Sequence, residues 1–169
     1  LVTGANTGLG METTRVLALR GANVTMACRA LDKAERARRS IVDTAGGRID
    51  ASQLDVLELD LNSLARTRES AREFTRRGRP LHLLINNAGI MIPMERRTAD
   101  GFEAHFGINH LAHFLFTNLL VDSLRAAGRA RVVVLASAAM GMATLTPALQ
   151  DLNWEQRKFN GFRSYGDSK

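Results

Sequence analysis

The first ten residues carry the feature that most constrains the fold, because an apolar strand runs there into a glycine-rich turn and then into a helix. The strand ends at Val2, the turn spans Thr3 to Gly10, and glycines stand at positions 4, 8 and 10. Gly4 allows a tight exit from the strand, Gly8 lets the backbone approach a phosphate, and Gly10 lets the helix pack close to the sheet. A helix N-terminus also favours anions. The stretch predicts a phosphate-binding turn; a glycine turn without a ligand is the alternative.

The rest of the chain alternates expected strands and helices. Apolar periodicity predicts helices at residues 9–20, 32–44, 62 or 63 to 76, and 102–124, and apolar runs predict strands at residues 24–28, 54–59, 81–85 and 131–136. Asp100 is expected to cap the last of these helices. Short apolar strands that alternate with helices are typical of a parallel sheet buried on both faces. We therefore expect an α/β fold with a doubly wound parallel sheet of the Rossmann type, and ligands at the carboxyl ends of its strands.

Length and composition favour one incomplete domain. The 169 residues begin inside a strand and end at a lysine with a candidate role in catalysis, so residues 1–169 are expected to lack the start of strand one and everything after Lys169. The net charge is +6, but the arginines are scattered among acidic residues on helices, which favours a solvated surface over nucleic-acid binding. The single cysteine, Cys28, excludes an internal disulfide and suits a reducing compartment. No apolar run reaches the roughly 18 residues of a membrane span. We expect a cytoplasmic location and leave an upstream membrane anchor open.

Polar residues follow the ends of three expected strands. Arg29 follows the second strand, where an acid would hold a ribose 2′-hydroxyl, and a basic residue there suits a 2′-phosphate. Asp60 follows the third strand and either accepts a hydrogen bond from an adenine or stabilises the next helix. Asn87, Ala88 and Gly89 follow the fourth strand and are small enough to lie beside a ribose, although an asparagine-rich turn is the simpler reading. Together these residues predict a dinucleotide site that prefers NADP(H) to NAD(H).

The whole chain resembles the short-chain dehydrogenase/reductase family, on the glycine pattern and on the Asn-Asn-Ala-Gly segment at 86–89. The segments that resemble its retinol dehydrogenase and protochlorophyllide reductase branch are residues 27–29 with Lys33, 86–91, 102–103 with 106–111, and 151–154. The resemblance implies use of NADP(H), and the active-site asparagine, serine, tyrosine and lysine of the family fall on Asn109, Ser137, Tyr165 and Lys169. The resemblance is also compatible with assembly of the protein into a homodimer or a homotetramer. Residue 136 is alanine where a first serine often stands, and residue 140 is methionine where histidine is common in this branch, which puts substrate contacts in doubt.

The four implied catalytic residues have chemistry suited to moving a proton. Tyr165 and Lys169 are four residues apart, so on a helix they share one face, and a nearby cation lowers the pKa of a phenol from about 10. Ser137 follows the fifth strand and could stabilise charge on a substrate oxygen, or simply end the strand. Asn109 lies in an apolar helix, where its amide either binds a water that relays protons to Lys169 or bonds to backbone.

The sequence thus predicts an oxidoreductase that transfers a hydride between NADP(H) and a small-molecule alcohol or carbonyl substrate, with Tyr165 as general acid and base. A non-catalytic nucleotide-binding or scaffold protein of the same fold and a protochlorophyllide reductase-like enzyme are the alternatives. The histidine spacings do not form a convincing metal site, and no nucleic-acid partner is expected. The residues expected to bind the cofactor are Gly4, Asn6, Thr7, Gly8, Leu9, Gly10, Arg29, Asp60, Leu61, Asn87, Ala88, Gly89, Tyr165 and Lys169.

Overall fold

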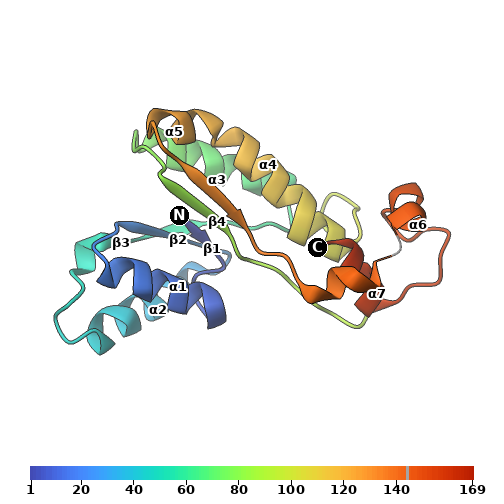
Figure 1. Ribbon diagram of the computed structural model, residues 1–169, viewed down its shortest axis with the longest axis horizontal. Helices are drawn as coiled ribbons and strands as arrows, with labels where there is room; N and C mark the ends of the chain where they lie inside the picture. The colour runs from blue at the N-terminus through green and yellow to red at the C-terminus, as the bar shows by residue number, and fades with distance from the viewer. Residues whose placement is uncertain (144) are drawn as a thin grey trace.

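The structure is a computed structural model that describes residues 1–143 and 145–169, and it shows a parallel sheet between two layers of helices (Figure 1). Across the described residues the strand order is β3-β2-β1-β4-β5, and every pair of neighbours is parallel. The strands are β1 (Val2–Thr3), β2 (Val24–Cys28), β3 (Leu54–Glu58), β4 (Leu83–Asn86) and β5 (Arg131–Val134). This order, with helical crossovers on both faces, confirms the expected doubly wound fold.

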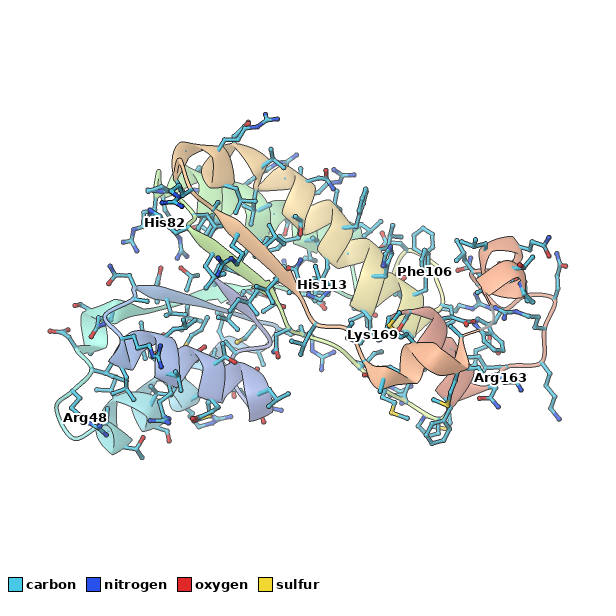
Figure 2. All side chains as sticks on the ribbon, in the orientation of Figure 1. Arg48, His82, Phe106, His113, Arg163 and Lys169 are labelled. Carbon is cyan, nitrogen blue, oxygen red and sulfur yellow. The ribbon has the colours of Figure 1, made fainter. Side chains whose placement is uncertain are left out.

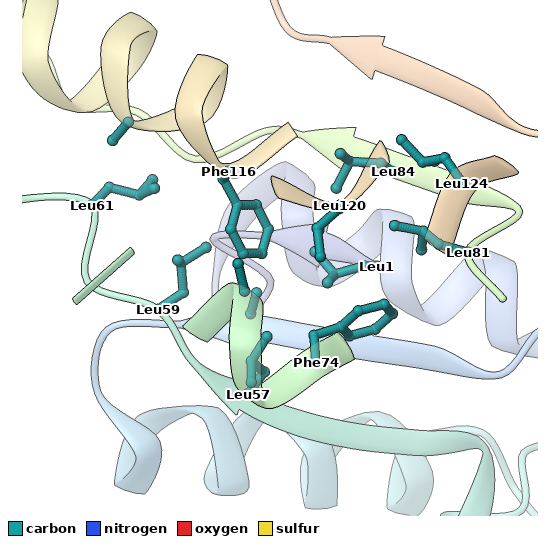
Figure 3. Close-up of a cluster of buried hydrophobic side chains, with 13 residues drawn as sticks. Leu1, Leu57, Leu59, Leu61, Phe74, Leu81, Leu84, Phe116, Leu120 and Leu124 are labelled. Atoms are coloured by element: carbon teal, nitrogen blue, oxygen red, sulfur yellow. The ribbon is translucent and has the colours of Figure 1, made fainter. Parts of the chain in front are cut away.

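Each face of the sheet has its own layer of helices (Figure 1). The helices of one layer are α1 (Gly8–Leu19) and α2 (Leu31–Thr44); those of the other are α3 (Leu64–Arg76), α4 (Ala112–Leu119) and α5 (Val121–Ala126). Successive strand residues point to opposite faces, so Val2 and Leu1 belong to different buried clusters. The cluster on the α3 and α4 side gathers Leu84, Phe74 and Phe116 (Figure 3). Two separate cores therefore hold the central strands from both sides.

The strand order reverses direction beside β1. From β1 the chain moves outward to β2 and β3, and then crosses back to place β4 on the other side of β1. The loops after β1 and β4 diverge at such a point and leave a crevice at the carboxyl ends of the strands, where ligands of open α/β sheets bind. Ligand-binding residues are therefore expected in the segments that follow β1, β2, β3 and β4.

The expected single helix over residues 102–124 is wrong. The segment contains η2, a π-helical turn at Phe106–Leu111, followed by α4 and then by α5, with a break at Leu120, where φ is −99° and ψ is 4°. Asp100 does not cap this segment, because its carboxylate accepts a hydrogen bond from the backbone N–H of Leu64 at 2.8 Å, in the first turn of α3. Ser63 is the N-cap residue of α3 and accepts from Arg66 N. Tertiary proximity overrides the local capping pattern here.

Strand boundaries lie within two residues of the expected ranges, and β2 matches its range, but the burial of β5 differs more. The expected sheet was buried on both faces, yet β5 lies at the edge of the described sheet, and Val132 and Val134 are 40% and 66% exposed. The valine run correctly predicted a strand, but an apolar run by itself cannot distinguish a central strand from an edge strand. Within residues 1–143 and 145–169, β5 is therefore less buried than the other four strands.

In the part of the segment after β5 that the structure describes, there are three short helices: η3 (Ala138–Met142), α6 (Leu145–Gln150) and α7 (Gly161–Asp167). Two glycines let α7 pack closely on other segments. A Cβ on Gly166 would lie 2.5 Å from the carbonyl oxygen of Ala139 in η3, and a Cβ on Gly161 would lie 2.6 Å from the carbonyl oxygen of Ile92. Both distances are too short for a side chain, so α7 is held between η3 and the loop that follows β4.

Candidate functional site

A cavity of about 470 Å³ lies where the sheet reverses direction. Its wall includes most of the residues that the sequence predicted for a cofactor: Gly4, Asn6, Thr7, Leu9, Gly10, Arg29, Asp60, Leu61, Asn87, Ala88 and Gly89. These residues come from the loops after β1, β2, β3 and β4, which the parallel sheet brings to one edge. The predicted residues therefore form one cavity although they are spread over almost ninety positions.

The glycine turn has the geometry that a close-approach loop requires. Gly4 and Gly8 have positive φ values of 65° and 53°, which disfavour other residues. A Cβ at Gly10 would collide with the carbonyl oxygen of Gly4 and would lie 2.5 Å from Nδ2 of Asn87. Gly10 therefore lets α1 start against the ends of β1 and β4, while Gly8 has no atom within 4 Å of its Cβ position and leaves space beside the helix N-terminus.

Thr3, at the end of β1, ties the turn to the loop after β4. Its hydroxyl accepts hydrogen bonds from the backbone N–H groups of Asn87 and Ala88, both at 2.9 Å, and its carbonyl oxygen accepts from Asn87 Nδ2 at 2.8 Å. The same hydroxyl lies 3.0 Å from Nε2 of buried His113. His113 Nδ1 lies 3.2 Å from the carbonyl oxygen of Asn109, which can only accept, so Nδ1 carries the proton and Nε2 accepts from Thr3.

The basic residue after β2 points to the cavity without an internal partner. Arg29 is exposed, lines the cavity, and makes no ion pair or side-chain hydrogen bond with any residue in 1–143 or 145–169. An adjacent hollow is lined by Asn6, Thr7, Lys33 and Arg36, of which Arg36 pairs with Asp32 on the surface. This end of the cavity is therefore cationic and can accept an anionic group.

Asp60, after β3, has a partner within its own turn. Its Oδ1 accepts from the backbone N–H of Asn62 at 3.0 Å, which stabilises the turn that leads into α3. This bond fits the simpler of the two interpretations of Asp60. The residue also lines the cavity, so both of the roles expected from the sequence are sterically open to it.

Tyr165 and Lys169 lie at the far end of the chain, in and just after α7. The ammonium nitrogen of Lys169 is 5.8 Å from the centroid of the Tyr165 ring, and it donates to the carbonyl oxygen of Leu135 at 3.0 Å. Leu135 directly follows β5 and lines the cavity. Lys169 therefore lies beside both the tyrosine and the cavity edge, close to the end of the chain (Figure 2).

Ser137 lies between the end of β5 and the start of η3. It is half-buried, and its hydroxyl accepts from Ala139 N at 3.2 Å, so it caps η3. Gly166 contacts Ala139 in the same short helix, and this contact brings the segment of Ser137 against the helix of Tyr165. The serine thus follows the strand as expected, and its hydroxyl proton is not used by the bond to Ala139.

Asn109, in the π-helical turn, is almost fully bonded. Its Oδ1 accepts from Ile90 N at 2.8 Å, and its Nδ2 donates to Ile90 O at 3.0 Å and to Ser168 Oγ at 2.9 Å. The backbone alternative for this amide is therefore present. A Cβ on Gly89 would lie 3.2 Å from Asn109 Oδ1 and 3.3 Å from Lys169 Nζ, so the absence of a side chain at Gly89 lets both groups approach one point.

Several wall residues were not anticipated: Ala27, Cys28, Leu59, Asn62, Ile90, Ile108 and Leu135. Most of them adjoin an expected strand end, so extending each strand-end motif by one or two residues would have found them. Burial raises the pKa of the Cys28 thiol to about 11, so this side chain presents a neutral thiol to the cavity. Ile108 had no such signal, because it comes from η2, whose π-helical geometry was not expected.

Two further features bear on the class of site. Within residues 1–143 and 145–169, no cluster of three or more histidine, cysteine, aspartate or glutamate side chains has the arrangement of a metal site. In the same part of the chain, none of the helices combines the length and apolar character needed to cross a bilayer.

Comparison with known families and proteins gives consistent matches. The profile of the family described as short chain dehydrogenase matches residues 1–147. Human retinol dehydrogenase 12 is 45% identical over 170 aligned positions that include the whole chain and 51% of the relative. Human retinol dehydrogenase 13 is 42% identical over the whole chain and 49% of the relative. The chain thus spans about half the length of these curated relatives.

Solved structures agree with the fold. An uncharacterised protein from Mycobacterium paratuberculosis has a TM-score of 0.79 and 42% identity, over 99% of this chain and 55% of that one. A metagenomic short-chain oxidoreductase in complex with NADP has a TM-score of 0.72 over 99% of this chain and 68% of that one. At 22% identity, this second match shows the fold alone.

Proposed function

This chain belongs to the short chain dehydrogenase family, and we propose that the whole protein interconverts an alcohol and a carbonyl compound by hydride transfer, with NADP(H) as its cofactor. The observation that carries the proposal is the position of Lys169, whose ammonium lies between the Tyr165 ring and the cavity-lining Leu135. Lys169 therefore links the tyrosine, a candidate general acid and base, to the wall of the cavity.

The residues of the cavity fit a dinucleotide. The glycine turn leaves room beside a helix N-terminus for phosphates, and the small residues Ala88 and Gly89 leave room beside the end of β4. When bound, NADP(H) supplies or accepts the hydride. Arg29 would hold the 2′-phosphate and Asn87 the ribose near the nicotinamide, while Asp60 would reach the adenine through the oxygen that Asn62 leaves free.

The four proton-transfer candidates do not themselves line the cavity, and Lys169 reaches its wall at the carbonyl oxygen of Leu135. In alcohol oxidation the substrate hydroxyl gives its proton to the phenolate of Tyr165, and in carbonyl reduction the phenol returns a proton to the substrate oxygen. Ser137 would donate its hydroxyl proton to the same oxygen and stabilise the charge that develops there. Lys169 supplies positive charge beside the ring. Asn109 would hold the loop at Ile90 in place and complete a relay toward Lys169.

The test of the reaction is Tyr165→Phe in the full-length protein. Loss of the hydroxyl should lower turnover about a thousandfold, the range for a general acid, and leave the dissociation constant of NADPH unchanged. Turnover by steady-state absorbance and binding by fluorescence titration would measure both quantities. Retained turnover would show that Tyr165 does not transfer the proton.

The test of cofactor preference is Arg29→Asp. A charge-assisted contact to a phosphate contributes about 1.5–3 kcal/mol, so the ratio of kcat/KM for NADPH to that for NADH should fall about tenfold to a hundredfold. Arg39→Asp makes the same charge change on α2, at an exposed arginine outside the cavity wall, and should leave the ratio unchanged. An equal response of the two variants would remove the assignment of Arg29.

We also infer an apolar substrate, as the names of the retinol dehydrogenase relatives suggest. Five large apolar side chains adjoin the two contacts of α7 and are 48–62% exposed: Met91, Met94, Met140, Met142 and Phe162. Methionine adapts to irregular apolar ligands. Phe162→Ser should lower kcat/KM for retinol while leaving that for 2-propanol unchanged, whereas Val132→Ser on β5 should change neither. A uniform response to both alcohols would contradict this substrate class.

A further inference from the structure

Two ionisable side chains and a serine form a fully buried cluster beside α7, and no step of the proposed reaction uses them. Glu103 is 1% exposed, His105 is 0% exposed, and Ser164 is 1% exposed. Nδ1 of His105 lies 2.9 Å from Oε1 of Glu103 and 3.0 Å from Oγ of Ser164. Ser164 directly precedes Tyr165 in the chain. We call these three residues the Glu103–His105–Ser164 cluster.

The hydrogen bonds of the cluster determine its protonation. The backbone N–H of Ile92 donates to Nε2 of His105 at 2.9 Å, so Nε2 carries no proton, and Nδ1 shares its one proton between the carboxylate of Glu103 and Oγ of Ser164. Burial by itself raises the pKa of a carboxyl, but hydrogen bonds from His105, from the N–H of Phe106 and from Ser164 hold the pKa of Glu103 below its ordinary value. The cluster is a neutral imidazole that bridges a carboxylate and a backbone amide.

The bridge joins segments that are far apart in the chain. Through Ile92, His105 holds the loop after β4, and through Ser164 it holds α7. The backbone N–H of Glu103 adds a bond to Asn153 Oδ1 at 3.0 Å, which brings in the loop before α7. The Glu103–His105–Ser164 cluster thus holds together the segments around Tyr165.

A contact between aromatic rings also links His105 to Tyr165. The Tyr165 ring meets the His105 ring edge-on at 6.1 Å between centroids, and the Phe159 ring stacks on His105 at 6.4 Å. Phe159 is backed by Trp154 at 5.7 Å, and the guanidinium of Arg157 lies 3.8 Å from the centroid of the Trp154 ring. The imidazole is therefore held on its other side and can act as a fixed wall for Tyr165.

We propose that His105 is a positioning residue for Tyr165, acting through the hydrogen bond to Ser164 and through the edge-on ring contact. The inference rests on the proposed role of Tyr165 in proton transfer. A side chain held by a buried, fully bonded neighbour keeps a single orientation, and a displacement of about 1 Å at a reacting group lowers a rate about a hundredfold.

Ser164→Ala tests the hydrogen bond in the full-length enzyme with the smallest change of volume. It should lower kcat about tenfold and leave KM and the dissociation constant of NADPH unchanged, because only the orientation of Tyr165 is loosened. Ser70→Ala is the matched control, since this buried serine on α3 also uses its hydroxyl in hydrogen bonds, which here go to backbone carbonyls at 2.6 and 2.9 Å, away from the cavity. Equal kcat values for the two variants would overturn the proposal.

Two substitutions of His105 separate positioning from folding. Asn places its amide nitrogen near the position of Nδ1 and can still donate toward Glu103 and Ser164, whereas Gln places its amide near Nε2 and can still accept from Ile92 N. His105→Asn should therefore retain about tenfold more kcat than His105→Gln. Equal kcat in both would assign His105 to stability alone.

Tyr165→Phe distinguishes failure of this inference from failure of the proposed function. If Tyr165→Phe keeps its turnover, the proposed function fails. If Tyr165→Phe loses turnover while Ser164→Ala matches Ser70→Ala, only the positioning role fails. In the Tyr165→Phe background, Ser164→Ala should cause no further loss, because the hydroxyl to be positioned is gone.

Discussion

The two parts of the candidate site are built in different ways. We call residues 1–89 the glycine-loop region, and there the polar groups of the site are satisfied mainly by backbone. The Thr3 hydroxyl accepts hydrogen bonds from two backbone N–H groups, and the Asn87 amide donates to the carbonyl oxygen of Thr3. In the tyrosine-helix region, residues 135–143 and 145–169, side chains from elsewhere hold the helix, through His105 at Ser164 and Asn109 at Ser168. One region depends on backbone geometry, and the other on distant side chains.

This difference affects how each region tolerates substitution. A backbone-built site fails when a Cβ is added where the chains touch, because backbone cannot move aside cheaply. A site supported by side chains fails by losing orientation while the fold persists. A Cβ added at a close backbone contact of the first region should therefore abolish cofactor binding, and loss of a supporting contact in the second should lower turnover with binding intact.

Gly10→Ala should have the largest effect. The new Cβ would collide with Gly4 O and crowd Asn87 Nδ2, so we expect about 3 kcal/mol or more of lost stability together with loss of NADPH binding. Urea denaturation and fluorescence titration measure the two quantities. Gly141→Ala, at a glycine with open space and no positive φ, is the control and should change neither. Normal NADPH affinity in Gly10→Ala would break the comparison between the two regions.

His113 bonds to Thr3 in the glycine-loop region and to Asn109, which in turn bonds to Ser168, and it should make stability depend on pH. Burial, with a smaller contribution from the Lys169 ammonium, lowers the pKa of folded His113 to about 4 from 6.5. Between these values the unfolded chain binds more protons than the folded chain, so stability should fall by roughly 3 kcal/mol as the pH drops from 6.5 to 4.

The His113→Gln variant isolates this contribution, because the variant has no imidazole to protonate. Urea titrations at pH 7, 5.5 and 4 should show a shallower loss of stability in the variant than in the parent. The same slope in both proteins would mean that other groups control the acid sensitivity.

Gly166→Ala should affect the tyrosine-helix region with a smaller loss of stability. A Cβ 2.5 Å from Ala139 O would push α7 away from η3, at about 2 kcal/mol, and would separate Tyr165 from Ser137. We expect turnover to fall at least tenfold with NADPH binding retained, and Gly141→Ala again serves as the control. A loss of binding as large as that of Gly10→Ala would show that the regions are not independent.

Asp100→Ala should have the smallest effect. The substitution removes the carboxylate that accepts from Leu64 N, and loss of such a helix-end bond costs about 1 kcal/mol. Thermal unfolding would detect it, with Asp122→Ala, in a highly exposed ion pair, as a neutral control. Because Asp100 lies in neither region, turnover and NADPH affinity should both stay unchanged.

The sequence predicted the glycine-loop region well for a physical reason. Glycines at 4, 8 and 10 and the small residues after β4 are direct requirements of close backbone contact, and parallel strand ends must meet at one edge. The fold class followed from local patterns, and most of the wall residues from Gly4 to Gly89 were named from these patterns and from the family resemblance, while Ala27, Cys28, Leu59 and Asn62 were not. The assignment of Arg29 to a phosphate stays a prediction, as do the roles of the four catalytic candidates.

The tyrosine-helix region was less accessible to prediction because its contacts join residues far apart in sequence. His105 and Ser164 are separated by 59 positions, and nothing in the local pattern connects them. The break at Leu120 and the π-helical turn around Asn109 were also missed, since periodicity over 102–124 is compatible with one helix. The prediction that Asp100 caps the helix at 102–124 was wrong for the same reason, because the residue that it caps, Leu64, is 36 positions away.

The edge strand β5 has a consequence for handling the chain in solution. Its outer side has no strand partner within residues 1–143 and 145–169, and Val132 and Val134 are exposed along it. Such an edge offers a template on which a neighbouring molecule can extend the sheet. This piece of the protein should therefore self-associate as its concentration rises, so dilute stocks, more than cooling, should keep it dispersed.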